Sequence, residues 1–194
     1  MKLIFLRHGE TEATEKRLYC GQSDIELSEA GKRALLPENR KFEYPAIEGF
    51  RVITSGMKRT EQTLRLIYGD LPHEQCPEFK EIDFGAFELR NYDELKKDPA
   101  YLEWIKDAYN NICPGGESRA QVVKRVTEKL DEVILGGRDT LIVAHGGVIP
   151  DSMEYLFHEG RNLYEWMPDP GTGYIVYLDV NKDGYKALSY EKIG

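Results

Sequence analysis

Leu3-Ile4-Phe5-Leu6-Arg7-His8-Gly9 is the first of two similar stretches in the chain, and Leu141-Ile142-Val143-Ala144-His145-Gly146 is the second. In each stretch four apolar residues are bounded by polar or glycine residues, which is typical of a strand buried on both faces of a parallel sheet. Residues 51–54, Arg-Val-Ile-Thr, predict a third strand of this kind. Open α/β sheets bind ligands beyond the carboxyl ends of their strands, so we expect His8 and His145 at one edge.

Helical patterns fall between the predicted strands. Ser118 and Gln121 form a capping box before an apolar repeat of helical spacing that ends at Gly136. A second helix is expected over about 57–68, and a third begins at Ser28 and stops before Pro37. Strands that alternate with helices indicate an α/β protein with a mainly parallel sheet.

The end of the chain and its middle predict two further features. Residues 174–178 and 185–190 are β-rich and flank a turn containing Gly184, which predicts an antiparallel hairpin at the sheet edge. Residues 82–114 are rich in aromatic and charged side chains and are expected to form an inserted helical cap. The predicted fold is a single domain over residues 1–194, a three-layer α/β/α sandwich with an edge hairpin and this cap.

Composition excludes several classes of function. The chain has 194 residues, with 26 basic and 34 acidic side chains and a formal charge of −8. That balance argues against nucleic-acid binding and against attachment to an anionic membrane surface. No apolar run is long enough for a membrane span or a signal peptide, and the three cysteines form no CxxC pair, so we expect a cytoplasmic protein. Small anionic substrates remain allowed, because local cations can override the global charge.

A third segment contributes a cation to the same sheet edge. Ser55-Gly56-Met57-Lys58-Arg59 follows the third strand, which places Arg59 in the first turn of the next helix. Arg59 and Arg7 both offer a permanently charged planar fork that suits a phosphoryl group. Together with the two histidines they predict a dianion pocket within an acidic protein. The alternative is an Arg59 on the helix surface, paired with Glu61 or Glu12.

Arg7-His8-Gly9-Glu10-Thr11, the later Arg59 and His145-Gly146 together resemble the signature of the histidine phosphatase superfamily, in its phosphoglycerate mutase-like branch. Further similarity lies in residues 21–31 and 81–88 and in the turn at 114–118. Arg-His-Gly by itself is a weak signal, but five motifs in order over residues 3 to about 150 are specific.

The resemblance implies a role for each residue of the motifs. His8 would be the nucleophile that carries the phosphoryl group, and Glu81 would be the general acid and base, with Glu10 and Glu88 as alternative acids. Arg7, Arg59 and His145 would stabilise the charge on the phosphoryl oxygens. No metal or cofactor is implied. The substrate, a small-molecule phosphate ester, would be bound by Arg7, Glu10, Thr11, Cys20, Gly21, Arg59, His145 and Gly146. Cys20 stands where the family more often has serine or threonine, and a thiol donates weakly.

The sequence favours a phosphatase over a mutase. Only 33 residues lie between Glu81 and Gly115, whereas cofactor-dependent mutases of the family usually have a longer insertion there. Ala13 and Thr14 also depart from the mutase pattern. Residues 17–22 are similar to a segment of the α-ribazole phosphatases of cobalamin synthesis. The alternatives are mutase-type phosphoryl transfer, an inactive phospholigand-binding module and a metalloenzyme using the two histidines. A homodimer is compatible with the sequence.

Overall fold

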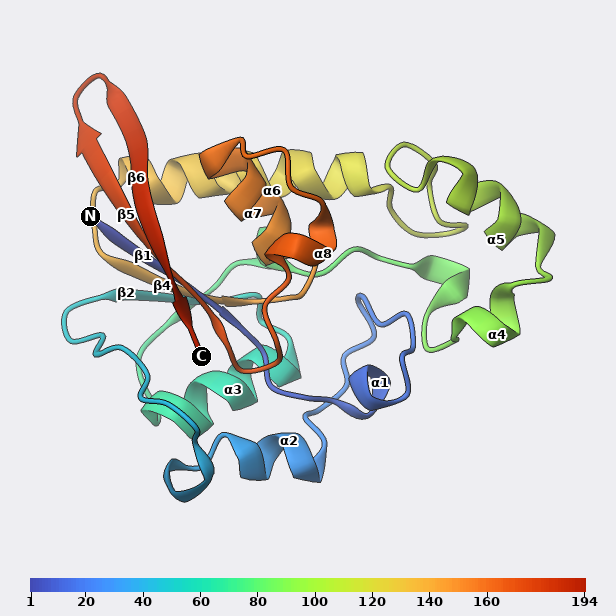
Figure 1. Ribbon diagram of the computed structural model, residues 1–194, viewed down its shortest axis with the longest axis horizontal. Coiled ribbons are helices and arrows are strands. Elements are labelled where there is room, and N and C mark those ends of the chain that lie inside the picture. The colour runs from blue at the N-terminus through green and yellow to red at the C-terminus, as the bar shows by residue number, and fades with distance from the viewer.

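A six-stranded sheet forms the centre of the molecule in the computed structural model, which describes residues 1–194 (Figure 1). Its strands lie in the order β3-β2-β4-β1-β5-β6. The strands are β1 (Lys2–Arg7), β2 (Arg51–Thr54), β3 (Glu74–Gln75), β4 (Thr140–Ala144), β5 (Gly173–Asn181) and β6 (Gly184–Ile193). The helices are α1 (Glu12–Glu15), α2 (Glu29–Ala34), α3 (Lys58–Tyr68), α4 (Tyr92–Leu95), α5 (Pro99–Trp104), α6 (Arg119–Leu135), α7 (Val148–Phe157) and α8 (Leu163–Trp166).

The sheet is parallel in one half and antiparallel at one edge. Strands β3, β2, β4 and β1 run parallel to their neighbours, whereas β5 pairs antiparallel with both β1 and β6. The residues of β1 and β4 are in register from Leu3 opposite Thr140 to Arg7 opposite Ala144. The two strands therefore end at the same level, and the residues that follow them emerge side by side.

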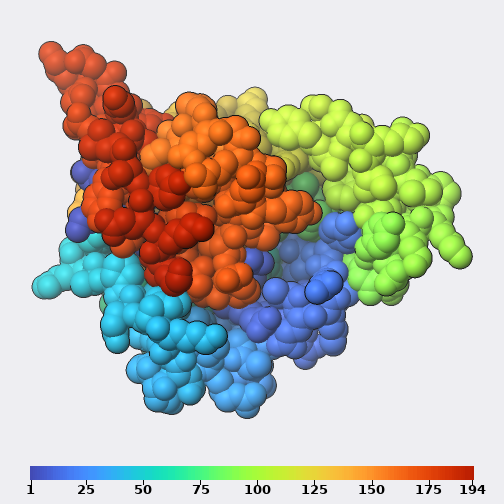
Figure 2. Space-filling view, in the orientation of Figure 1, coloured from blue at the N-terminus to red at the C-terminus, as the bar shows by residue number.

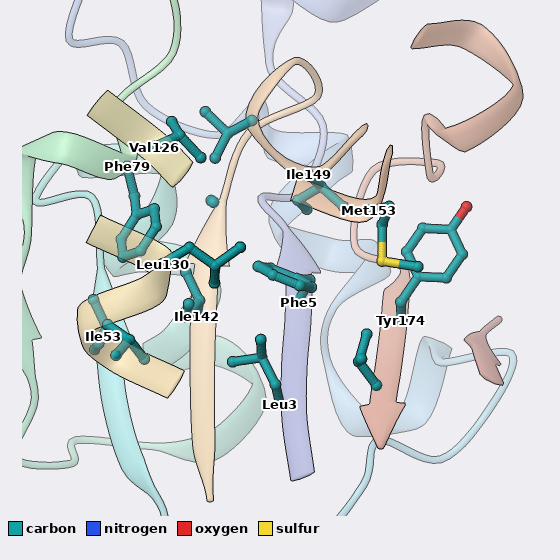
Figure 3. Close-up of a cluster of buried hydrophobic side chains, with 14 of the residues drawn as sticks. Leu3, Phe5, Ile53, Phe79, Val126, Leu130, Ile142, Ile149, Met153 and Tyr174 are labelled. Atoms are coloured by element: carbon teal, nitrogen blue, oxygen red, sulfur yellow. The ribbon is translucent and has the colours of Figure 1, made fainter. Parts of the chain in front are cut away.

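Helices cover both faces of the sheet. The alternation of side chains along β1 turns Leu3 and Phe5 to one face and Ile4 and Leu6 to the other. The first face packs against α6, α7 and α8, and the second packs against α3 and the end of α2. Figure 3 shows Phe5 between Leu130 of α6 and other apolar side chains of the first face. These layers explain why β1 and β4 are continuously apolar, since both of their faces are buried.

The segment 82–114, here called the cap, has a small core of its own. Phe87, Leu95, Tyr101, Trp104 and Cys113 are buried together, with Tyr19 and Phe84 packed against them. Most of these side chains are aromatic, and their rings meet mainly edge to face. Helices α4 and α5 of the cap lie to one side of the sheet in Figure 1.

The predicted fold class and elements are confirmed. The helices over 57–68 and 119–135, the hairpin and the parallel strands all form, and Ser118 and Gln121 make the expected reciprocal capping box. Four elements were not predicted: β3, α1, α8 and α7. The first three have only two to four residues, and α7 begins with six buried residues in succession, so no amphipathic repeat marks it. No helix is both long and apolar enough to cross a membrane.

Candidate active site

The carboxyl ends of β1, β4 and β2 bring the two predicted histidines together. Because β4 lies between β1 and β2 in the sheet, His8 follows one strand and His145 follows its neighbour. Their rings meet edge to face with centroids 5.2 Å apart. Ser55, directly after β2, completes this row of strand ends, and all three side chains are buried. The predicted common edge is therefore present.

His8 has one ring nitrogen bound to the protein and one free of protein hydrogen bonds. Its Nδ1 lies 2.7 Å from the carbonyl oxygen of Gly9. A carbonyl only accepts hydrogen bonds, so Nδ1 carries the proton and Nε2 keeps its lone pair. Burial, followed by the charges of Arg59 and Arg7, holds the pKa of His8 well below its usual range. The ring is thus a neutral imidazole with an available nucleophilic nitrogen.

His145 is also neutral, but the protein uses both of its ring nitrogens. Arg59 donates from Nε to Nδ1 of His145 over 3.2 Å, and Nε2 lies 2.8 Å from the hydroxyl oxygen of Ser55. Since an arginine only donates, the proton of His145 is on Nε2, which donates to Ser55. Burial and the charge of Arg59 lower the pKa of His145 well below its usual range.

Arg59 is buried at the base of the site, at the second residue of α3. Its Nη2 donates to the carbonyl of Gly21 over 2.6 Å, and its Nη1 donates to the carbonyl of Ser23 over 3.0 Å. With the bond to His145, three of its five N–H groups are used and two remain for a ligand. The surface pairing with Glu61 or Glu12 that competed with this prediction does not occur, because Arg59 forms no ion pair with either residue.

Arg7 has a guanidinium that the protein satisfies only in part. Nη1 donates to the carbonyl of Pro168 over 2.7 Å, whereas the buried Nε has no acceptor. A Cβ atom built on Gly146 would lie 3.1 Å from the Arg7 guanidinium carbon, so glycine leaves that group its space. Buried donors in proteins are almost always paired. The orphaned Nε of Arg7 therefore points to an acceptor brought by a ligand.

Glu81 lies close to the start of α7. Its Oε2 accepts a 2.8 Å hydrogen bond from the backbone N–H of Gly147, and its Oε1 accepts one of 3.0 Å from that of Ile82. The residue is 9% exposed, so Glu81 does not belong to a solvated acidic surface. Two backbone donors hold the carboxyl in one orientation.

The alternative acids are placed differently. Glu88 accepts hydrogen bonds from the backbone N–H groups of Gly21, Gln22, Ser23 and Phe84. Its carboxylate therefore organises the loop whose carbonyls hold Arg59. Glu10 is half-buried, and its own carbonyl oxygen accepts from the backbone of Ser28.

The remaining predicted residues surround this centre. Thr11 is buried and caps α1 through Thr14, and Gly21 contacts Arg59 and Glu88 through its backbone. Cys20 is a half-buried thiol whose pKa burial raises, and the charge of Arg59 opposes that rise. His73 and His158, which matched no motif, lie outside the site and are exposed.

A cavity of about 430 Å³ opens beside these residues. Arg7, Glu81, Gly146 and Gly147 are among its lining residues, whereas His8 and His145 are not. In Figure 2 the cavity lies where the orange residues around 150–167 face the yellow-green cap. The rest of its wall is largely apolar and aromatic and includes Tyr19, Ile82, Phe84, Trp104, Ile105, Val122, Leu163, Tyr164 and Met167.

Three polar residues of the site were not predicted. Ser55 accepts the hydrogen bond from Nε2 of His145, and Arg119 and Asp151 pair with each other in the cavity wall. Asp151 had one detectable signal, since it is an acid directly after the apolar run Val148-Ile149-Pro150. No group of three or more histidine, cysteine, aspartate or glutamate side chains is arranged to hold a metal ion.

Known proteins are similar to this chain in sequence and in fold. An adenosylcobalamin/alpha-ribazole phosphatase of Escherichia coli is 31% identical over 156 residues, which covers 77% of this chain and 75% of that protein. A 2,3-bisphosphoglycerate-dependent phosphoglycerate mutase of Bradyrhizobium diazoefficiens is 29% identical over 206 residues, covering 99% and 98%.

Solved structures agree with these sequence matches. The crystal structure of the alpha-ribazole phosphatase from Shigella flexneri has a TM-score of 0.78 and 26% identity, covering 97% of this chain and 95% of that one. A phosphoglycerate mutase from Thermus thermophilus has a TM-score of 0.71 and 26% identity, covering 100% and 99%. The family model of the histidine phosphatase superfamily (branch 1) matches residues 3–192, and this chain is therefore an enzyme that belongs to that superfamily.

Proposed function

We propose that this protein is a metal-independent phosphomonoester hydrolase that works through a phosphohistidine at His8. The observation that carries the proposal is the pairing of a neutral His8, whose Nε2 is free, with Arg7, whose buried Nε lacks an acceptor. One group is a nucleophile and the other an unsatisfied cation, and both suit a phosphoryl group. Residues 1–194 would form one domain, with residues 82–114 as its cap.

The first half of the reaction transfers the phosphoryl group to the enzyme. Nε2 of His8 attacks phosphorus, the N–P bond forms and the bond from phosphorus to the ester oxygen breaks. Glu81 gives its proton to the departing oxygen, which leaves as an alcohol. Arg7 and the two unused N–H groups of Arg59 neutralise the charge on the phosphoryl oxygens. His145 acts by orienting Arg59, since both of its ring nitrogens are bound to protein.

The second half releases phosphate. Glu81, now a carboxylate, takes a proton from a water molecule as the water oxygen attacks phosphorus. The N–P bond breaks, His8 regains its lone pair and inorganic phosphate leaves. Glu81 ends protonated, ready for the next ester. The fixed hydrogen bonds from Gly147 and Ile82 keep its carboxyl oriented through both steps.

The cavity favours an ester whose bulky alcohol part includes an apolar or aromatic group. Its wall has ten hydrophobic residues of sixteen, and the carboxylate of Asp151 would repel a substrate that carries a carboxylate. A phosphoglycerate mutase must hold a carboxylate or a second phosphate, for which this cavity offers only Arg119, already paired with Asp151. We therefore favour hydrolysis over the mutase-type transfer that several relatives suggest. As the substrate we favour α-ribazole 5′-phosphate.

Phosphate release from a panel of esters, measured in EDTA, tests this proposal. The panel contains p-nitrophenyl phosphate, α-ribazole 5′-phosphate and 3-phosphoglycerate, with His8→Ala as the control variant. We expect hydrolysis without metal and a loss of at least about 10³-fold in His8→Ala, which should still bind vanadate. Turnover that survives in His8→Ala would overturn the phosphohistidine mechanism. Conversion of 3-phosphoglycerate to its isomer without phosphate release would favour the mutase.

A further inference from the structure

The wall of the cavity contains an ion pair that the proposed reaction does not use. Arg119, the first residue of α6, donates from Nε to Oδ1 of Asp151 over 3.0 Å, and its Nη2 bonds to the same oxygen. The side chain of Asp151 is 4% exposed, and that of Arg119 is 33% exposed. Both residues also line a second cavity of about 240 Å³.

This pair leaves one acceptor and one donor unused. Oδ1 of Asp151 takes both hydrogen bonds, while Oδ2 accepts none and Nη1 of Arg119 donates none to the protein. Oδ2 is not sealed inside the protein, because the only fully buried side-chain polar atoms without a partner are Arg7 Nε and Trp104 Nε1. Burial raises the pKa of Asp151 to about 6, and Arg119 opposes that rise, so the group is ionised at neutral pH.

An acceptor beside a donor matches a hydroxyl group, which donates one hydrogen bond and accepts another. A ligand carboxylate or phosphate would gain the donor but meet the negative charge of Oδ2, and an amine would gain the acceptor but meet the guanidinium. Charge-assisted hydrogen bonds of this kind are stronger than neutral ones and discriminate sharply against a ligand that lacks the hydroxyl.

Helix α7 places this pair close to the reacting centre. Asp151 lies four residues after Gly147, its backbone N–H donates to the Gly147 carbonyl, and the Gly147 N–H holds Glu81. One helical turn, about 5.4 Å along the axis, thus separates Asp151 from Gly147, whose N–H holds the proposed proton donor Glu81. A hydroxyl bound there belongs to the alcohol part of the ester, a few bonds from the ester oxygen. The aromatic side chains Tyr19 and Phe84 line the same cavity.

We propose that Arg119 and Asp151 form a hydroxyl-recognition subsite that selects phosphate monoesters of polyhydroxylated alcohols, such as sugar or nucleoside 5′-phosphates. This inference rests on the proposed phosphatase function and deepens it. Asp151 accepts from a substrate hydroxyl through Oδ2, and Arg119 donates to a hydroxyl through Nη1. Both residues determine specificity and take no part in the transfer of the phosphoryl group.

The test compares adenosine 5′-monophosphate with its 2′,3′-dideoxy analogue. The two esters have the same phosphate, the same leaving oxygen and the same base, so only the sugar hydroxyls differ. For the wild-type enzyme we expect kcat/KM to favour the ribonucleotide by about 10- to 100-fold. In Arg119→Met and in Asp151→Leu the preference should fall to less than about 3-fold. Two variants are used so that misfolding of one leaves the comparison intact.

Arg51→Gln is the matched control, because Arg51 forms a two-bond ion pair with Glu74 on β3, and neither residue lines the cavity. The Arg51→Gln enzyme should keep the full wild-type preference for the ribonucleotide over its dideoxy analogue. An equal kcat/KM for the two esters in the wild type, or an undiminished preference in either folded variant, would overturn the subsite.

Calorimetric titration of both nucleotides into the protein separates this inference from the proposed function. If no ester is hydrolysed but the ribonucleotide still binds about 10-fold tighter or more, the phosphatase proposal fails and the subsite stands. If p-nitrophenyl phosphate is hydrolysed but the two nucleotides bind equally, the subsite fails and the phosphatase proposal stands.

Discussion

Arg59 Nε donates a hydrogen bond of 3.2 Å to Nδ1 of His145, and this contact places the proton of His145 on Nε2, where it faces Ser55. The bond connects the start of α3 with the end of β4. The other nitrogens of Arg59 bond to the carbonyls of Gly21 and Ser23, so a single guanidinium joins two strand ends and a loop. Arg59 therefore organises the base of the site as well as supplying charge.

Arg59→Lys should lower kcat/KM by about 10²- to 10³-fold, although the positive charge is kept. An ammonium cannot reach His145 and the carbonyls of Gly21 and Ser23 together, so the ring of His145 and the loop lose their common partner. The thermal unfolding temperature should fall as well, since buried carbonyls lose their donor. Steady-state kinetics and thermal unfolding measure both effects. Arg51→Lys is the control, and activity of Arg59→Lys within about 3-fold of wild type would contradict the prediction.

Glu81→Gln should slow alkyl phosphate esters by about 10²-fold or more and p-nitrophenyl phosphate much less, because a nitrophenolate needs little protonation to leave. The amide keeps one oxygen for the Gly147 N–H but presents an NH₂ group to the other backbone donor. Rates of phosphate release from both esters provide the measurement. Glu128→Gln, at an exposed acid of α6 that does not line the cavity, serves as the control. Equal slowing of both esters would assign the acid to another residue.

Much of the fold and the row of strand-end residues follows from local sequence. Continuous apolar runs predict strands covered on both faces, and the residue after each run must then emerge at the ligand edge, which places His8, His145 and Arg59. These inferences succeed because they depend on the direction of parallel strands. They do not require knowledge of how any side chain is oriented.

Features that depend on contacts between distant segments could not be predicted. Glu88 and Asp151 are acids in the sequence, and no local pattern shows that one gathers loop amides while the other pairs with Arg119. The tautomer of His145 depends on Arg59, which lies 86 residues away in the chain. The partner that each of these side chains meets depends on where the side chain is buried, and its burial depends on the whole fold.

The stability of the protein should fall as the pH is lowered from 7.5 to 5.5. In the unfolded chain His8 and His145 take up protons near pH 6.5, whereas burial keeps both neutral to well below that pH in the folded protein. The unfolded state then binds more protons, and each histidine costs up to about 1.4 kcal/mol per pH unit below that point. Asp151, whose pKa burial raises to about 6, opposes part of this loss below pH 6.

Thermal unfolding at several pH values checks this dependence. His8→Asn removes one of the two titrations, so its unfolding temperature should fall less steeply between pH 7.5 and 5.5 than that of the wild type. His73→Asn is the control, since His73 is exposed and its pKa is raised, mainly through the hydrogen bond to the Leu71 carbonyl. It should not reduce the slope. An unfolding temperature that rises on acidification would contradict the buried neutral histidines.

Gly147→Ala should damage catalysis more than stability. The backbone at Gly147 has φ −89°, which alanine adopts without strain, but a Cβ atom there would lie 2.5 Å from Oε1 of Glu81. The carboxyl must move, and a displacement of about 1 Å in a catalytic group costs about 10²-fold in rate. We expect that loss for alkyl esters, with a smaller loss for p-nitrophenyl phosphate. Gly136→Ala is the control, because φ is −65° there and the nearest contact of the new Cβ is 3.2 Å from a carbonyl outside the site. A Gly147→Ala enzyme as active as Gly136→Ala on alkyl esters would mean that the position of Glu81 does not limit the reaction.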